Sequence, residues 1–184
     1  MPDSPSMELG ERASPRQGGA PCRLFEWERC LKYGVRGGIL ILDALFPGQY
    51  INLQGVPEYD DRDIDAFVEG LGTVEVKTDR HRDSGNFFFE VEVGGKPGCI
   101  FASRADWLLY WFPPDEVYLI PLPELQYWLA ANWRKYTEQR RERDVYSRRG
   151  QRKWRAVGII PRRTTILHEV PGARKIMLKE PIHV

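Results

Sequence analysis

The sequence has few of the residues that build zinc sites and disulfide scaffolds. Its three cysteines, Cys22, Cys30 and Cys99, form no C-x-x-C pair and no pattern with nearby histidines. This spacing favours reduced, structural cysteines. The sequence also lacks an apolar run of the roughly 18 residues that a membrane span needs, and its N-terminus lacks the apolar core of a signal peptide. We therefore expect a cytoplasmic protein with no membrane contact.

Length and composition predict one domain. The chain has 184 residues, and a typical domain has about 100 to 200. Hydrophobic residues make up 42% and aromatic residues 12%, which is enough for a packed core. Residues 1–20 are rich in Pro, Ser, Gly and charge, so ordering them would cost entropy and bury little. We expect a disordered N-terminal tail, 1–20, followed by a single domain, 21–184.

Helix and strand patterns alternate along that domain. We expect a short helix from Leu24 that stops before Gly34, and a helix over 104–112 that begins at a capping box of Ser103 and Asp106. The fold class predicted from this order is α/β, with a central mixed β-sheet flanked by helices. The other expected elements are strands at 39–46, 49–53, 87–93, 98–102, 116–120 and 156–160, with 87–93 and 98–102 paired in a hairpin, and a helix at 124–143.

Residues 63–77 read as a β-hairpin around the glycines at 70 and 72. Alternation along its two strands sets Asp65 opposite Glu75 and Asp63 opposite Lys77, so that all four side chains emerge on one face. The residues expected on the opposite face are Ile64, Ala66, Val74 and Val76.

Three carboxylates on a covered sheet face repel one another unless a cation lies among them. Their oxygen atoms suit Mg²⁺ or Mn²⁺. Such an ion polarises a phosphodiester and lowers the pKa of a bound water, while an adjacent lysine stabilises charge. The competing interpretation is that Glu75 and Lys77 form an exposed ion pair, which is worth under about 1 kcal/mol.

The order of these residues resembles the PD-(D/E)xK nuclease superfamily, the fold of many restriction enzymes, junction resolvases and phage exonucleases. The resemblance is carried by Asp63, by 75-EVK-77 on the next strand and by a preceding helix with Glu26 and Glu28. It implies a restriction-endonuclease-like fold and covers about residues 60–125. Four runs resemble small phage and plasmid members in particular: 74-VEVKTD-79, 85-GNFFFEVE-92, 96-KPGCI-100 and 103-SRADWLLYWF-112.

The resemblance implies a role for each residue of the motif. Asp63 or Asp65 would be the metal-binding aspartate, Glu75 the second carboxylate and Lys77 the catalytic lysine, and the backbone carbonyl of Val76 would also face the metal. No proline precedes the aspartate, and 60-DDRDID-65 offers four acidic residues for one place. Asp63 is favoured because it matches the spacing of the family, and Asp65 is the second choice because it should face Glu75.

Five further residues could support this site. Family members often add a helical glutamate, for which Glu26 and Glu28 compete, although either could be an ordinary solvent-facing residue. Glu90 lies on the polar face of the expected strand 87–93, as does Glu92. Asn86 lies in the loop that resembles the family's GN, and a turn residue is the simpler interpretation.

The segment 134–163 is strongly basic. It contains twelve Lys or Arg and three acidic residues, a net charge of +9, whereas the whole chain carries +1. We expect this segment to bind the phosphates of DNA, with recognition of the backbone or of the structure rather than of a base sequence. The expected contacts are Arg134, Arg140, Arg141, Arg148, Arg149, Arg152, Lys153 and Arg155.

The sequence therefore predicts a Mg²⁺- or Mn²⁺-dependent deoxyribonuclease. One alternative is a nucleic-acid-binding accessory protein of repair, replication or packaging that keeps the fold without catalysis. Another is a structural domain whose arginines meet an acidic protein. Cleavage of both DNA strands would favour a two-fold homodimer.

Overall fold

The computed structural model describes residues 22–136, 140–146 and 152–184, and only the backbone of 22–31, 143–146 and 152–154. The expected tail, 1–20, lies outside this range. The α-helices are α1 (Leu24–Leu45), α2 (Pro57–Asp60), α3 (Cys99–Ala102), α4 (Leu122–Tyr136) and α5 (Arg163–Glu169), with a 3-10 turn η1 (Arg82–Ser84). The strands are β1 (Cys22–Arg23), β2 (Tyr50–Asn52), β3 (Ala66–Val68), β4 (Gly72–Thr78), β5 (Phe89–Val93), β6 (Lys96–Pro97), β7 (Trp107–Phe112), β8 (Glu116–Pro121), β9 (Arg141–Tyr146), β10 (Arg152–Ile159) and β11 (Arg174–Met177).

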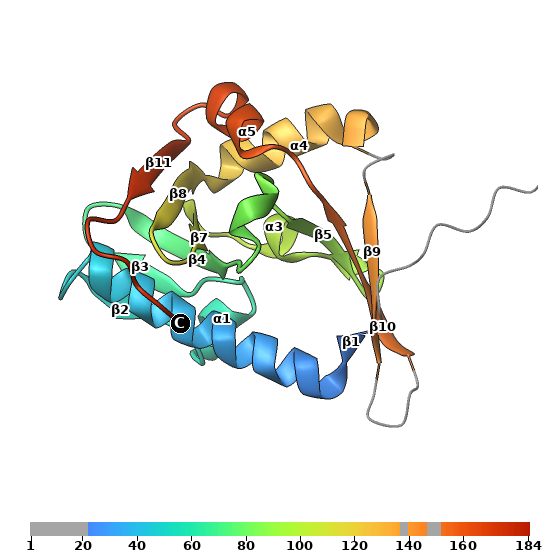
Figure 1. Cartoon of the computed structure of the whole chain (residues 1–184), viewed down its shortest axis with the longest axis horizontal. Coiled ribbons are helices and arrows are strands. Elements are labelled where there is room, and N and C mark those ends of the chain that lie inside the picture. The colour runs from blue at the N-terminus through green and yellow to red at the C-terminus, as the bar shows by residue number, and fades with distance from the viewer. Residues whose placement is uncertain (1–21, 137–139, 147–151) are drawn as a thin grey trace, which may run out of the picture.

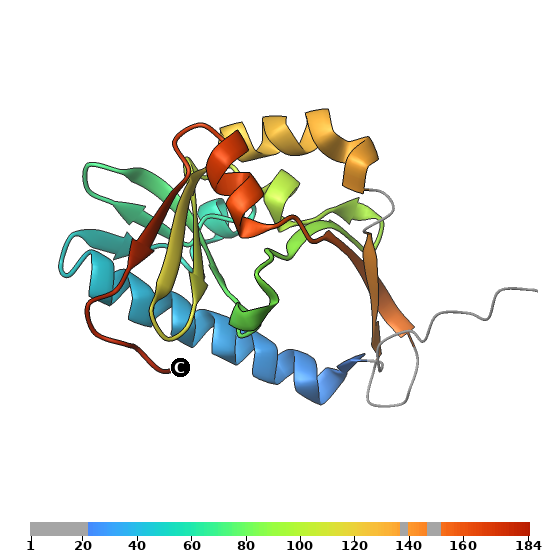
Figure 2. The ribbon, with the colours of Figure 1, turned by 45° about the horizontal axis from the view of Figure 1, so that its top comes forward.

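The strands form two sheets, which confirms the mixed α and β class. The larger sheet has the order β11-β8-β7-β4-β3-β2, and its neighbours are antiparallel except for the central pair β4 and β7. The smaller sheet has the order β1-β9-β10-β5-β6. In Figure 1, α1 runs along the lower side of the larger sheet, α4 and α5 lie on the upper side, and β9 and β10 stand at the end away from β11. The turned view in Figure 2 shows the same layers.

Helix α1 is longer than the sequence predicts. It continues through Gly34 and includes the expected strand at 39–46, so that prediction is wrong. The cause is tertiary packing, which overrides the low helix propensity of glycine. A β-carbon at Gly37 would lie 2.5 Å from Oγ1 of Thr78, so the absence of a side chain lets the helix approach β4 closely. Ile41 and Leu42 are then buried against the sheet.

The segment predicted as a helix over 104–112 is strand β7. Because helices and other strands cover both faces of the larger sheet, its central strand is apolar at successive positions and loses the alternation that marks a half-buried strand. Ser103 and Asp106 form no capping box. The Ser103 hydroxyl donates to the Asp63 carbonyl at 2.7 Å, and the Asp106 carboxylate accepts from the Thr73 backbone at 2.8 Å.

Three other predictions of local structure need correction. The expected strand 87–93 is β5, and it belongs to the smaller sheet and not to one central sheet. Its hairpin partner is β6, because the expected strand 98–102 contains the helical turn α3. Helix α4 ends at Tyr136, and part of the expected helix is strand β9. The strands expected at 49–53, 116–120 and 156–160 are confirmed in β2, β8 and β10.

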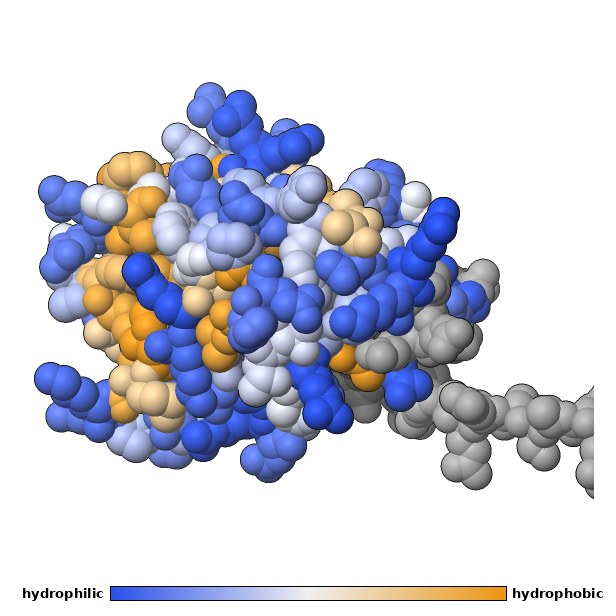
Figure 3. Space-filling view, turned by 90° about the horizontal axis from the view of Figure 1, so that it is seen from above, coloured by the Kyte–Doolittle hydropathy of each residue, from blue (hydrophilic) through white to orange (hydrophobic). Residues whose placement is uncertain are grey.

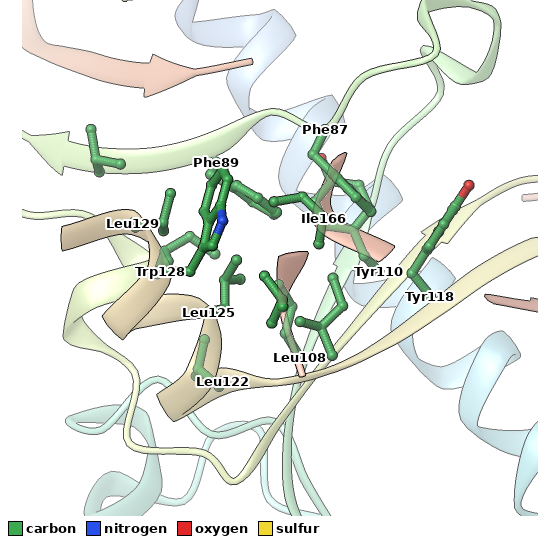
Figure 4. Close-up of a cluster of buried hydrophobic side chains, with 14 of the residues drawn as sticks. Phe87, Phe89, Leu108, Tyr110, Tyr118, Leu122, Leu125, Trp128, Leu129 and Ile166 are labelled. Carbon is green, nitrogen blue, oxygen red and sulfur yellow. The ribbon is translucent and has the colours of Figure 1, made fainter. Parts of the chain in front are cut away.

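Two hydrophobic cores lie on opposite faces of the larger sheet. One packs α1 against Val74 and Val76 of β4. The other fills the space between the sheet, α4, α5 and β5, and it is rich in aromatic rings, several of which appear in Figure 4. Phe87 stacks on Phe89 at a centroid distance of 5.0 Å and meets Tyr110 edge-on at the same distance. This second core is the layer that covers the face carrying Glu75.

Figure 3 shows a mostly hydrophilic surface on which apolar patches gather toward the end that carries β11 and β2. Among the described residues, the exposed large apolar side chains include Ile51, Phe67 and Met177. No helix in the described part of the chain is long and apolar enough to cross a membrane.

A buried carboxylate on β8 holds three other elements, η1, α5 and β11, to that strand. Glu116 is 7% exposed, and its oxygens lie 2.7 Å from Arg163 of α5, 3.2 Å from Lys175 of β11 and 3.4 Å from Arg82 of η1. Burial alone would raise the pKa of Glu116, but hydrogen bonds from Tyr118, Arg163 and Lys175 outweigh it and lower the pKa to about 2. The cluster holds η1, α5 and β11 to one strand.

Glu116→Gln should therefore destabilise the fold. We expect a loss of about 3 to 5 kcal/mol at pH 7, because Arg163 is left buried without its counter-ion. A carboxyl whose pKa is lowered by folding stabilises the folded state at pH values above its ordinary pKa, 4.5. This stabilisation is lost as the pH falls to about 2. Urea unfolding at several pH values should give a flatter profile for the variant in that window. Parallel profiles would contradict this role of Glu116.

Candidate metal and nucleic-acid site

The hairpin of β3 and β4 has the register predicted from the sequence. Ala66 pairs with Val74, and the regular ladder of this hairpin ends there. The Asp65 backbone donates to the same Val74 carbonyl at 2.9 Å and accepts from Leu53 at 2.9 Å, which marks a bulge just before β3. The regular pairing expected between Asp65 and Glu75 is therefore not formed. Val74 and Val76 face the core under α1, and Glu75 faces the aromatic core on the other side.

Glu75 and Lys77 form an ion pair in the layer between the larger sheet and the elements that cover it. Their charged atoms are 3.0 Å apart, and the side chain of Glu75 is 6% exposed whereas that of Lys77 is 36% exposed. Burial raises the pKa of Glu75 to about 8, although Lys77 opposes the shift. Burial also lowers the pKa of Lys77, but Cys99, Glu75 and Asp65 more than offset this effect and raise it above its ordinary value. This burial rules out the solvated surface pair.

Asp65 is fixed at both carboxylate oxygens. Oδ2 accepts from the backbone N–H of Val76 at 2.7 Å, and Oδ1 accepts from the side-chain amide of Gln54 at 2.9 Å. The carboxylate thus lies beside the strand that carries Glu75 and Lys77. Its charge is one of the causes that raise the pKa of Glu75. At Val76 it is the N–H that contacts the aspartate, and a metal contact by the Val76 carbonyl stays a prediction.

Asp63 does not lie on the ladder, so its expected place opposite Lys77 in the hairpin is wrong. Its φ of 47° is left-handed, a conformation that is uncommon outside glycine and that bends the chain before β3. This turn also moves Ile64 into the aromatic core instead of the core under α1. Asp63 still lies in the electrostatic environment of Lys77. Burial raises the pKa of Asp63, Lys77 opposes the shift, and Asp65 reinforces it.

The smaller sheet contributes Glu90 to the same group of charges. Burial raises the pKa of Glu90, Lys77 lowers it and Asp63 raises it, so this carboxyl lies within electrostatic reach of the same ammonium. Cys99, at the start of α3, also lies against Lys77, and burial raises the pKa of its thiol to about 12, so the thiol is a weak nucleophile. A supporting role of Glu90 in a site therefore stays a prediction. Glu92 instead lies 3.9 Å from Arg140.

The donor chemistry of this group fits a hard divalent cation. Asp63, Asp65, Glu75 and Glu90 supply only carboxylate oxygens, the ligands that Mg²⁺ and Mn²⁺ prefer. Crowded carboxylates with raised pKa values gain from a nearby cation. Within the described residues, however, no three His, Cys, Asp or Glu side chains converge closely enough to hold a metal ion. The positive charge in this arrangement comes from Lys77.

Of the other residues proposed to support the site, Asn86 has a described side chain, and the two glutamates of α1 do not. Asn86 is a turn residue, because its side-chain amide donates to the Ser84 carbonyl at 3.0 Å and its backbone N–H donates to the Ser84 hydroxyl at 3.2 Å. Glu26 and Glu28 lie on α1 as expected, and their side chains are outside the described residues.

The described arginines of the basic segment lie mainly on β9 and β10, next to the site. Arg141 of β9 pairs with Gly158 of β10, and Gly158 pairs with Glu90 of β5. One strand therefore lies between Arg141 and Glu90, and their backbones are roughly 10 Å apart. Arg140 lies 3.5 Å and Arg155 2.7 Å from Glu142. These pairs are exposed and individually worth less than about 1 kcal/mol, so phosphate can replace them.

The remaining basic residues are less completely described. Arg134 is exposed on α4. Arg152 and Lys153 belong to β10, but their side chains lie outside the described residues, as do Arg148 and Arg149 entirely.

Sequence reasoning missed Gln54 and Ser103. Gln54 lies in the turn after β2, and Ser103 directly follows α3 and donates to the Asp63 carbonyl. No periodicity marks either residue, since each acquires its role from a contact with a distant part of the chain.

Comparisons of the chain with protein-family models, with curated proteins and with solved structures found no match. The function is therefore inferred from the geometry of the residues above.

Glu75→Gln should change how stability depends on pH. A carboxyl whose pKa rises on folding keeps its proton in the folded state while the unfolded chain loses it, so stability falls as the pH rises from 4.5 to about 8. The variant lacks this group, and its unfolding free energy, measured in EDTA, should fall less over that window. Glu124→Gln on α4 controls for the loss of one charge. Equal slopes for Glu75→Gln and the natural protein would contradict the burial of Glu75.

Proposed function

We propose that this protein is a metal-dependent nuclease that hydrolyses the phosphodiester bonds of DNA. The observation that carries the proposal is the buried pair of Glu75 and Lys77 on β4, with the Asp65 carboxylate fixed beside it. A solvated ion pair would not need burial, and a purely structural pair would not need three further carboxyls around one ammonium. The order also matches the resemblance: helix α1, then the aspartate at the start of β3, then E-x-K on the next strand.

Asp65 and Glu75 are the residues that would hold the metal, with Asp63 and Glu90 as further oxygen donors. Asp65 is favoured over Asp63 because its carboxylate is already oriented by two hydrogen bonds. A bound Mg²⁺ or Mn²⁺ would supply a polarised phosphodiester and a water of lowered pKa. The chain's own contribution is the Lys77 ammonium, which is held cationic beside the carboxylates and stabilises negative charge that develops on the phosphate.

The basic strands would bind the flanking phosphates. Arg141 of β9 and Arg155 of β10 are exposed on strands that pair, through β10, with the strand carrying Glu90, and Arg140 directly precedes β9. Charge presented along strands in this way suits contact with the DNA backbone. The proposal also includes a homodimer, a cytoplasmic location and similarity to the phage-type members of the nuclease superfamily.

The direct test is a cleavage panel over linear, circular, single-stranded and four-way-junction DNA, with Mn²⁺ or with EDTA. We expect cleavage only with metal, and a loss of at least about 100-fold in Lys77→Met and Glu75→Gln, because each removes a group that acts on the transition state. Lys96→Met, on β6, is the matched lysine control and should retain activity. Equal cleavage in EDTA or in the two site variants would refute the proposal.

A second candidate is a nucleic-acid-binding protein that keeps the fold without catalysis. Two observations favour it: Lys77 already pairs with Glu75, and no three ligands converge in the described residues. It predicts salt-sensitive binding of DNA with no turnover on any substrate of the panel in Mn²⁺.

Both candidates predict that the arginines set the salt dependence of DNA binding. The triple variant Arg140→Ala, Arg141→Ala and Arg155→Ala should lower the slope of log affinity against log salt by about 0.9 for each phosphate of duplex DNA that it no longer neutralises. Binding is measured in EDTA, so that cleavage does not interfere. Lys179→Ala, beyond β11, should keep the slope of the natural protein. A triple variant with an unchanged slope would exclude these strands as the DNA-binding surface.

A further inference from the structure

Gln54 is a side chain from outside the hairpin that hydrogen-bonds Asp65. It follows β2 in a tight turn, and its amide nitrogen lies 2.9 Å from Oδ1 of Asp65. An ionised carboxylate only accepts hydrogen bonds, so the amide must present its N–H₂ group to Asp65. Gln54 and Asp65 are eleven residues apart in the sequence, and the pairing of β2 with β3 brings them together.

The turn that carries Gln54 is itself held in place. The Gln54 backbone donates to the Asn52 side chain at 3.0 Å, and the next residue, Gly55, donates to the Asp60 side chain at 2.9 Å. Leu53 donates to the Asp65 carbonyl at 2.9 Å, which fixes the start of the turn to the aspartate itself. The position of the Gln54 backbone is therefore determined by three hydrogen bonds.

Helix α1 closes the other side of Gln54. A β-carbon at Gly38 would lie 3.6 Å from the Gln54 amide nitrogen and 3.8 Å from the side chain of Val76. The amide is thus enclosed between the helix backbone, β4 and Asp65. With Val76 donating to Oδ2, both oxygens of Asp65 have a fixed donor, and each retains a lone pair for another partner.

We propose that Gln54 is a positioning residue that orients Asp65 for the metal. This inference rests on the proposed function, because it assigns Gln54 a role at the same site. Partners that hydrogen-bond a metal-ligating carboxylate fix its orientation, and their loss typically costs about 10- to 100-fold in metal affinity. Gln54 contacts no reacting group and acts only through Asp65.

The test is a titration of the protein with Mn²⁺ in the absence of DNA, by calorimetry or by the electron paramagnetic resonance of the ion. Gln54→Met keeps the length of the side chain and removes the donor, and it should weaken Mn²⁺ binding by about 10-fold. Gln54→Glu places an acceptor against Asp65 and should weaken it further. Asn132→Leu, which removes an amide that donates within α4 at 3.0 Å, is the control and should bind Mn²⁺ as the natural protein does.

A second readout separates positioning from a general effect on folding. Because only metal affinity is affected, DNA cleavage by Gln54→Met should return to within about twofold of the natural rate at saturating Mn²⁺. Unchanged Mn²⁺ affinity in both Gln54 variants would overturn this inference and leave the proposed function standing. Activity that stays low at every Mn²⁺ concentration would also overturn it. A natural protein that neither binds Mn²⁺ nor cleaves DNA would overturn the proposed function itself.

Discussion

The ion pair of Glu75 with Lys77 is the constraint on which the arrangement of the site depends. A carboxyl that is only 6% exposed is costly to ionise, and the Lys77 ammonium on the same face of β4 lowers that cost. Asp65 just before β3, Asp63 from the preceding turn and Glu90 from the smaller sheet all lie in the electrostatic environment of that one ammonium. One lysine therefore faces several carboxyls, which is a shortage of positive charge. Burial is the main cause that raises the pKa values of Asp63, Glu75 and Glu90, and repulsion among the carboxyls adds to it.

That shortage gives the site its chemical character. A group of carboxyls that share too little positive charge is suited to bind a hard divalent cation, and it lies one sheet away from exposed arginines that suit phosphate. The sequence is basic in 134–163 and acidic elsewhere. In the structure, the arginines of the basic segment lie near the carboxyls that gather around the β3–β4 hairpin. The Glu116 cluster has the opposite balance. There, three cations surround one carboxylate, its pKa is lowered, and its role is to hold the fold.

The sequence predicted the hairpin and its register well, because glycines at 70 and 72 mark the turn and alternation fixes which side chains share a face. It failed at α1 and β7, for opposite reasons. The glycines of α1 suggested an end to the helix, yet Gly37 is needed for close packing against Thr78. The apolar run of β7 suggested a helix, because a strand buried on both faces has no alternation to recognise.

Alternation along β4 predicted that Glu75 and Lys77 share one face of the sheet. It did not predict the backbone of the two aspartates, because Asp65 lies at a bulge before β3 and Asp63 has a left-handed conformation that takes it off the ladder. Gln54, Ser103 and Cys99 reach the site through tertiary contacts that no local pattern records.

In the proposed nuclease, Asp65 and Glu75 hold a divalent cation beside Lys77. The most direct measurement is anomalous X-ray scattering from crystals of the protein soaked in Mn²⁺. We predict a peak in contact with carboxylate oxygens of Asp65 and Glu75, and its loss in Glu75→Gln. No peak at these residues, with Lys77 still paired to Glu75 at saturating Mn²⁺, would contradict the account.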